Sequence, residues 1–252
     1  MPFVKNSGSM SKVKTIALIP ARAGSKGVLN KNIRSLAGHP LVEWSIAACL
    51  RARTIDRVVV STDSTQYAAM CRVMGAEVPF IRPSEISCDR STDIEFIAHA
   101  LDWFANDGGE PDLIVHIRPT TPYRDPALID QAVAAFQVAT DATALRSVHE
   151  MSESAYKTFE INAKGCLQGV GSDNTELDAA NNARQQFPVT FSANGYVDVL
   201  STVFIRQTGL LHGNAVMPFV TPRVTEVDCE DDFAFLEYEI ARDPLLLRQL
   251  FD

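Results

Sequence analysis

The chain has 252 residues, a formal net charge of −8 and a hydrophobic content of 46%. This length suits one large α/β domain with a substantial core, and the negative charge disfavours nonspecific nucleic-acid binding, which needs a broad basic face. No apolar run reaches the roughly 18–20 residues of a membrane-spanning helix, so we expect neither a nucleic-acid nor a membrane partner.

The N-terminal segment and the cysteines bear on the cellular compartment. Residues 1–12 lack the apolar core of a signal peptide, and we interpret them as a disordered lead or an expression remnant before a domain that spans residues 13–252. Five cysteines, an odd number without CxxC pairs, argue against a disulfide framework or a zinc site. We therefore expect reduced thiols and a cytoplasmic protein.

Segments rich in Val, Ile and Leu alternate with amphipathic segments through the first 150 residues. The apolar segments predict strands at residues 16–19, 57–61, 77–80, 113–117 and 142–148. Pro40 suits the first position of a helix that ends near residue 51, Thr92 opens a capping box, and Asp125 before Pro126 starts a further helix. The alternation predicts an α/β fold, a Rossmann-like three-layer sandwich with a mostly parallel sheet.

Residues 149–188 break this pattern. They are polar, contain Gly165, Gly169 and Gly171, and show only short β-like runs. A structureless loop of this length inside a compact domain is uncommon, so we expect an excursion that packs against a second subunit. A strand region at residues 196–205 and a closing helix at residues 230–250 follow.

The loop after the first predicted strand indicates a phosphate-rich ligand. Residues 16–32 read IALIPARAGSKGVLNKN, so Gly24 and Ser25 lie among Arg22, Lys26 and Lys31. Glycines let backbone N–H groups approach an anion, and the cations neutralise its charge. The spacing is neither that of a P-loop nor G-x-G-x-x-G, and an ordinary basic surface turn remains the alternative.

Polar residues also follow the other predicted strands. Ligands of open α/β sheets bind at the carboxyl ends of the strands. The polar residues lie just past the second, third and fourth strands, at Thr62 and Asp63, at Arg82, and from Arg118 to Thr121. The sequence therefore predicts a cleft along one edge of the sheet.

The loop string resembles the opening motif of the CMP-sialic acid synthetases (acylneuraminate cytidylyltransferases), ARxxSKGxxxKN, with every fixed position filled. Five further blocks follow in the family's order: VVVSTDS from Val58, IRPSEISCD from Ile81, HIRPTTPYR from His116, ARQQFPVTFSANG from Ala183 and EVDCEDDF from Glu226. The resemblance implies a homodimer, joined through the excursion, that uses CTP to activate a 2-keto-3-deoxy sugar acid and releases pyrophosphate.

The resemblance implies roles for individual residues. The nucleotide-binding set would be Ala21, Arg22, Gly24, Ser25, Lys26, Asn32, Arg82, Ser91 and Thr92. Within it, Arg22 and Lys26 would hold the triphosphate, and Lys31 would lie close to the reacting phosphate. Arg22, Lys31 and Asp228 would be the catalytic residues.

Glu226 and Asp228 are two residues apart, which puts both carboxylates on one face of an extended chain. Such oxygen ligands suit Mg²⁺ (or Mn²⁺) bound together with triphosphate oxygens. The family usually has Asp at both positions, so the longer Glu226 would bind through water or leave Asp228 as the main ligand. A solvated acidic run is the alternative, because three further carboxylates follow within four residues.

The sugar site is where the chain departs from the family. The substrate-binding set implied by the resemblance is Arg118, Thr120, Thr121, Arg184, Ser192, Asn194 and Asp198. The family generally has Gln, Arg and Tyr where this chain has Arg118, Ser192 and Asp198. Arg184 is retained and is the best candidate for the substrate carboxylate, which a guanidinium binds bidentately.

These replacements predict a nonulosonic acid other than N-acetylneuraminate, with a modified C5–C9 portion such as legionaminic or pseudaminic acid. Three alternatives stay open. The first is that the replaced positions do not touch the sugar. The second is that the substrate is an eight-carbon acid such as 3-deoxy-manno-octulosonate. The third is that the chain binds a nucleotide without turnover.

Overall fold

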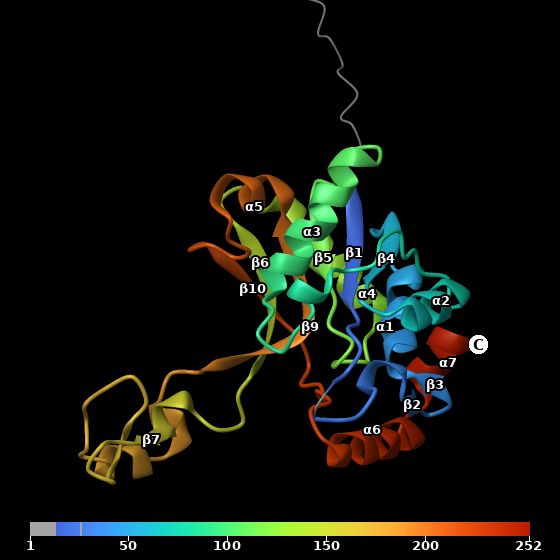
Figure 1. Ribbon diagram of the computed structural model, residues 1–252. Helices are drawn as coiled ribbons and strands as arrows, with labels where there is room; N and C mark the ends of the chain where they lie inside the picture. The colour runs from blue at the N-terminus through green and yellow to red at the C-terminus, as the bar shows by residue number, and fades with distance from the viewer. Residues whose placement is uncertain (1–13, 26) are drawn as a thin grey trace, which may run out of the picture.

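The computed structural model describes residues 14–25 and 27–252, and a six-stranded mixed sheet forms its centre (Figure 1). The strand order is β10-β6-β9-β5-β1-β4. The disordered lead predicted at residues 1–12 lies outside the described residues. The strands are β1 (Thr15–Pro20), β4 (Arg57–Ser61), β5 (Leu113–His116), β6 (Ala144–Glu150), β9 (Phe191–Ser201) and β10 (Val216–Val220). Only β9 runs antiparallel to its neighbours β5 and β6, so the predicted mostly parallel sheet is confirmed.

Helices cover both faces of the sheet, which confirms the three-layer sandwich (Figure 1). They are α1 (Leu41–Arg51), α2 (Thr65–Val73), α3 (Asp93–Asn106), α4 (Pro126–Val138), α5 (Thr202–Thr208), α6 (Glu230–Arg242) and α7 (Leu245–Phe251). Alternate β1 side chains enter two separate cores. Ala17 and Ile19 pack with residues of α1 and α4, whereas Ile16 and Leu18 pack with residues of α3.

Two predicted helix starts, those of α3 and α4, are confirmed by the hydrogen bonds that cap them. The Thr92 backbone N–H donates to the Glu95 carboxylate, which closes the capping box at the start of α3. Asp125 Oδ1 accepts from the Ala127 N–H at 2.8 Å at the start of α4. Helix α1 begins one residue later than predicted, with Pro40 as its cap.

Three predicted elements were wrong in their extent. Residues 77–80 make only an isolated bridge from Glu77 to Val59, because Pro79 has no N–H with which to extend a ladder. The strand region at 196–205 ends at Ser201, whose hydroxyl accepts from the Phe204 N–H and caps α5. The closing helix is two helices, since Pro244 separates α6 from α7.

Residues 149–188 leave the sheet through β6 and return through β9, and Figure 1 shows them standing apart from the rest of the chain. They form the small hairpin of β7 (Phe159–Ile161) and β8 (Leu167–Gly169) and three short 3-10 helices. A further hairpin, β2 (Ser35–Leu36) with β3 (His39–Pro40), lies beside α1. None of the helices in the described residues has the length and apolar surface that a bilayer crossing demands.

Candidate functional site

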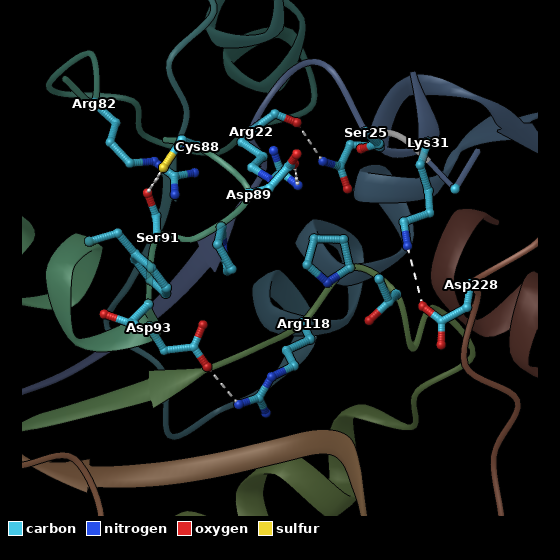
Figure 2. Close-up of a pocket in the computed structure, with 17 residues that line it drawn as sticks. Arg22, Ser25, Lys31, Arg82, Cys88, Asp89, Ser91, Asp93, Arg118 and Asp228 are labelled. Atoms are coloured by element: carbon cyan, nitrogen blue, oxygen red, sulfur yellow. Dashed lines mark hydrogen bonds and ion pairs between the residues drawn. The ribbon is translucent and has the colours of Figure 1, made fainter. Parts of the chain in front are cut away.

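A cleft of about 490 Å³ lies at the carboxyl ends of β1, β4 and β5, where the sequence predicts it (Figure 2). Residues from both ends of the chain form its walls, because the parallel strands end at the same edge of the sheet. The predicted site residues that line it are Arg22, Ser25, Lys31, Asn32, Arg82, Ser91, Thr92, Arg118, Thr120 and Asp228.

The loop after β1 is pinned at both ends. The Ala23 N–H donates to Asp63 Oδ1 at 2.8 Å, and Gly24 has a φ of +71°, a conformation that favours glycine. A Cβ on Gly27 would lie 2.6 Å from the Asp228 carbonyl oxygen, so only glycine lets the loop approach the segment before α6 so closely. Lys26, the remaining predicted cation of this loop, lies outside the described residues.

Lys31 connects this loop to the acidic segment that precedes α6. Its Nζ donates to the Val227 carbonyl oxygen at 2.7 Å and lies 3.6 Å from Asp228 Oδ1 (Figure 2). The Lys31 side chain is 15% exposed, whereas that of Asp228 is 78% exposed. The Asp228 carboxylate is therefore open to a ligand in the cleft, next to a fixed positive charge.

Arg82 and Asn32 are the two buried polar residues of the cleft wall. Arg82 Nη2 donates to the Ser61 carbonyl oxygen at 2.7 Å, and its guanidinium carbon lies 5.3 Å from the centre of the Phe96 ring. Burial lowers the pKa of Arg82 from its ordinary value. Asn32 Nδ2 donates to the Arg22 carbonyl oxygen at 2.9 Å, which fixes the backbone at the start of the loop.

The turn before α3 closes the cleft opposite Lys31. Arg22 Nη2 lies 2.8 Å from Asp89 Oδ1, and Cys88 Sγ lies 3.3 Å from Ser91 Oγ (Figure 2). The hydrogen bond to Ser91 lowers the pKa of the Cys88 thiol. This turn thus places the Cys88 thiol, the Ser91 hydroxyl and the Asp89 carboxylate along the same wall of the cleft.

The predicted sugar-binding residues divide into three groups, of which only the first reaches the cleft. Arg118 donates to Asp93 and Asp198, and Thr120 donates to Glu226 at 2.9 Å. A second group lies beneath the cleft: Thr121 and Asn194, joined by a hydrogen bond, and Asp198, all buried.

The third group is Arg184, which lies within the excursion, and Ser192, which lies in β9 where it leaves the excursion. Arg184 donates to Glu150 Oε1 at 2.7 Å and lines a separate cavity of about 350 Å³. Ser192 pairs with His149 where β9 leaves the excursion. One subunit therefore does not bring these two residues to its own cleft, and their roles stay predictions.

Of the acidic pair Glu226 and Asp228, only Asp228 is placed to serve as a metal ligand in the cleft. Within residues 14–25 and 27–252, no three His, Cys, Asp or Glu side chains converge as a metal site. Asp228 lines the cleft, whereas Glu226 accepts from Thr120 and is not part of its wall. Since Mg²⁺ in nucleotide sites uses one or two carboxylates and takes its other ligands from phosphate and water, Asp228 fits such an ion.

Seven residues that line the cleft were not among the predicted site residues: Pro20, Gly27, Cys88, Asp89, Asp93, Phe96 and Pro119. The capping box offered a signal for two of them. It placed the first turn of α3 at the edge of the sheet, and Asp93 and Phe96 belong to that turn. The Asp93 carboxylate bonds to Arg118, which no local pattern shows.

The family model described as "Cytidylyltransferase" matches residues 16–169. The chain is 28% identical over 224 residues to an N-acylneuraminate cytidylyltransferase of Escherichia coli, covering 89% of this chain and 51% of that protein. It is 38% identical over 126 residues to a CMP-N,N'-diacetyllegionaminic acid synthase of Legionella pneumophila, covering 50% of this chain and 54% of the relative. The chain spans about half the length of these relatives.

Among solved structures, the chain is similar to a CMP:2-keto-3-deoxy-manno-octonic acid synthetase complexed with CTP. The TM-score is 0.67 at 11% identity, with 91% of this chain and 99% of that chain covered. At this identity the likeness shows the fold alone.

Proposed function

Because the chain belongs to the cytidylyltransferase family, we propose that it transfers CMP from CTP to a 2-keto-3-deoxy sugar acid and releases pyrophosphate. The proposal rests on the cleft, which is lined by the loop after β1 on one side and by Asp228 on the other. Lys31 lies between them, with its Nζ 3.6 Å from Asp228 Oδ1. This arrangement suits a polyphosphate, because Arg22, Lys31 and a glycine-containing loop meet at the end of a parallel strand.

In the proposed reaction, the sugar hydroxyl oxygen forms a bond to the α-phosphorus of CTP. The bond from that phosphorus to the oxygen bridging to the β-phosphate breaks, pyrophosphate leaves, and the hydroxyl proton passes to water. Arg22 and Lys31 would offset the negative charge that builds on the phosphate oxygens. The remaining contribution of the protein is to position two reactants.

Asp228 would hold Mg²⁺ or Mn²⁺ together with the triphosphate, with Glu226 as a ligand through water at most. The metal would supply charge neutralisation on the phosphate oxygens. The Asp228 carboxylate is exposed beside Lys31, and this supports its role as the main ligand. Glu226, already bonded to Thr120, has less freedom to serve.

The nucleoside would occupy the side of the cleft formed by Arg82, Asn32 and the turn before α3. Arg82 Nε is buried and has no hydrogen-bond partner within the described residues, so its donor is free for a ligand. Ser91 and Thr92 would contact the cytosine, partly through their backbone, as the resemblance implies. An amine on the base can donate to a backbone carbonyl, which would distinguish cytosine from uracil.

We also infer that the protein is a homodimer and that the excursion reaches the partner subunit. Tyr156, Ile161 and Leu167 of the excursion are exposed apolar side chains, which a partner would cover. Arg184 would then complete the sugar site of the other subunit, which accounts for its distance from its own cleft. All five cysteines are free, in keeping with a cytoplasmic protein.

For the sugar, we propose a nonulosonic acid with a modified C5–C9 portion in preference to N-acetylneuraminate. The replacements at Arg118 and Asp198 support this choice, because Arg118 lines the cleft and forms an ion pair with the buried Asp198. The match to a relative named for diacetyllegionaminic acid supports the same class. An eight-carbon acid is the second candidate, and the fold likeness alone does not favour it.

Pyrophosphate release tests the proposal. The full chain is incubated with CTP, Mg²⁺ and a panel of acids: N-acetylneuraminate, its 5,7-diamino relatives and 3-deoxy-manno-octulosonate. We expect release with at least one nonulosonic acid, and none when UTP replaces CTP. Binding of CTP without release in the presence of any acid would favour a noncatalytic nucleotide-binding protein.

A further inference from the structure

Arg118 differs from the other cations of the cleft because two carboxylates hold it. Nη1 lies 2.9 Å from Asp198 Oδ2, and Nη2 lies 2.9 Å from Asp93 Oδ2. The ion pairs described for Arg22 and Lys31 involve one carboxylate each. Two carboxylates therefore fix the orientation of one guanidinium at this end of the cleft.

Asp198 is the buried anchor of this group. Its side chain is 1% exposed on β9, opposite His116 of β5, and Oδ2 lies 3.6 Å from His212 Nε2. Burial alone would raise its pKa, but the nearby His212 side chain and the charge of Arg118 hold the pKa of Asp198 well below its usual range. Asp198 is therefore ionised at neutral pH and fixes the guanidinium without touching the cleft.

Asp93 and Arg118 are the members that face the cleft, with side chains 42% and 20% exposed. A guanidinium has five N–H donors, so Arg118 keeps donors beyond those used by its two partners. Asp93 provides an acceptor beside them. Such a pair suits a hydroxyl or an acylamino group, which both donates and accepts.

We propose that Asp93 and Arg118 determine sugar specificity by binding a hydroxyl or acylamino group of the sugar acid, and that Asp198 is a positioning residue that holds Arg118. The inference rests on the proposed function and deepens it. The sugar would then lie at the Arg118 end of the cleft, where Asp93 and Arg118 contact it and Asp198 holds Arg118 in place.

The test measures kcat/KM for each sugar acid at saturating CTP, and KM for CTP, in Asp93→Asn, Arg118→Gln, Asp198→Asn and the double variant Arg118→Gln with Asp198→Asn. Arg57→Gln is the matched control, because Arg57 also forms a bidentate pair, with Glu77, but at the opposite end of β4. Melting temperatures of all variants are recorded alongside.

We expect Asp93→Asn and Arg118→Gln to lower kcat/KM for the preferred acid by about tenfold or more, because each removes a charge-assisted hydrogen bond to the sugar. The KM for CTP should stay unchanged. Asp198→Asn should raise the KM for the sugar, and the double variant should be no worse than Arg118→Gln alone. Arg57→Gln should leave the order of preference among the acids unchanged.

Equal loss with every acid, or a rise confined to the KM for CTP, would overturn the inference. So would additive effects of Arg118→Gln and Asp198→Asn, since independent sites add to within about twofold. If Asp198→Asn does not fold, the selectivity of Asp93→Asn and of Arg118→Gln among the acids still tests whether these two residues bind the sugar. Turnover with unchanged selectivity refutes this inference alone, whereas no pyrophosphate from the wild-type chain with any acid refutes the proposed function as well.

Discussion

His116 should make the stability of the protein fall on mild acidification. The side chain is the last of β5, is 1% exposed, and packs edge-on against Phe96 with ring centres 5.4 Å apart. Neither ring nitrogen has a hydrogen-bond partner within the described residues. Burial, and next the charge of Arg118, lower the pKa of His116 to about 4.

The sign follows from proton binding. An unfolded histidine has a pKa of about 6.5, so between pH 6.5 and 4 the unfolded chain binds more protons than the folded chain, and stability is lost as the pH falls. At about 1.4 kcal/mol for each tenfold change in proton affinity, the full loss is about 3 kcal/mol. About 2 kcal/mol of it should be gone by pH 5, before most carboxylates titrate.

Urea denaturation at pH 7, 6 and 5, followed by tryptophan fluorescence, measures this loss. The comparison variant is His116→Leu, which removes the titrating group and keeps an apolar side chain against Phe96. We expect the free energy of unfolding of this variant to change with pH less steeply than that of the wild-type protein. Parallel pH dependences of the two proteins would refute the assignment of the acid sensitivity to His116.

Four further predictions concern the cleft and the assembly. Asp228→Asn should lower turnover by at least about a hundredfold in an assay with Mg²⁺, as the loss of transition-state charge stabilisation does, and near-normal activity would move the metal site elsewhere. Arg22→Ala and Lys26→Ala should each raise the KM for CTP, since each removes charge-assisted hydrogen bonds to phosphate worth about 1.5–3 kcal/mol, and a rise confined to the sugar KM would contradict this placement. Sedimentation velocity at micromolar concentration should report a dimer, and a monomer would refute the role of the excursion. Alkylation of Cys88 by N-ethylmaleimide, followed by peptide mass spectrometry, should slow when CTP is present; an unchanged rate would place the nucleotide away from the turn before α3.

The sequence predicted the strands that carry the site because their apolar runs are buried on both faces, as in β1 and β5. It missed β10, an edge strand that contains Pro218 and alternates between exposed and half-buried residues. It also predicted a strand at residues 77–80, where Val78 and Phe80 pack into separate cores without forming a ladder.

The same distinction applies to the candidate site. The loop after β1 is a local string, so Arg22 and Lys31 could be placed from the sequence together with the strand that precedes them. The partners of Arg118 come from α3 and β9, up to 80 residues away along the chain, and only the folded sheet brings them together. Arg184 depends on how β6 and β9 extend beyond the sheet, and the residue pattern carries no signal for that geometry.

The central claim is that a sugar hydroxyl displaces pyrophosphate from the α-phosphorus of CTP in this cleft. The most direct measurement follows oxygen: the preferred sugar acid, labelled with ¹⁸O at its C2 hydroxyl, reacts with unlabelled CTP, and the products are analysed by mass spectrometry. The account predicts a CMP-sugar that retains ¹⁸O between the sugar and phosphorus, together with unlabelled pyrophosphate. Label in the pyrophosphate, or CMP without a CMP-sugar, would contradict it.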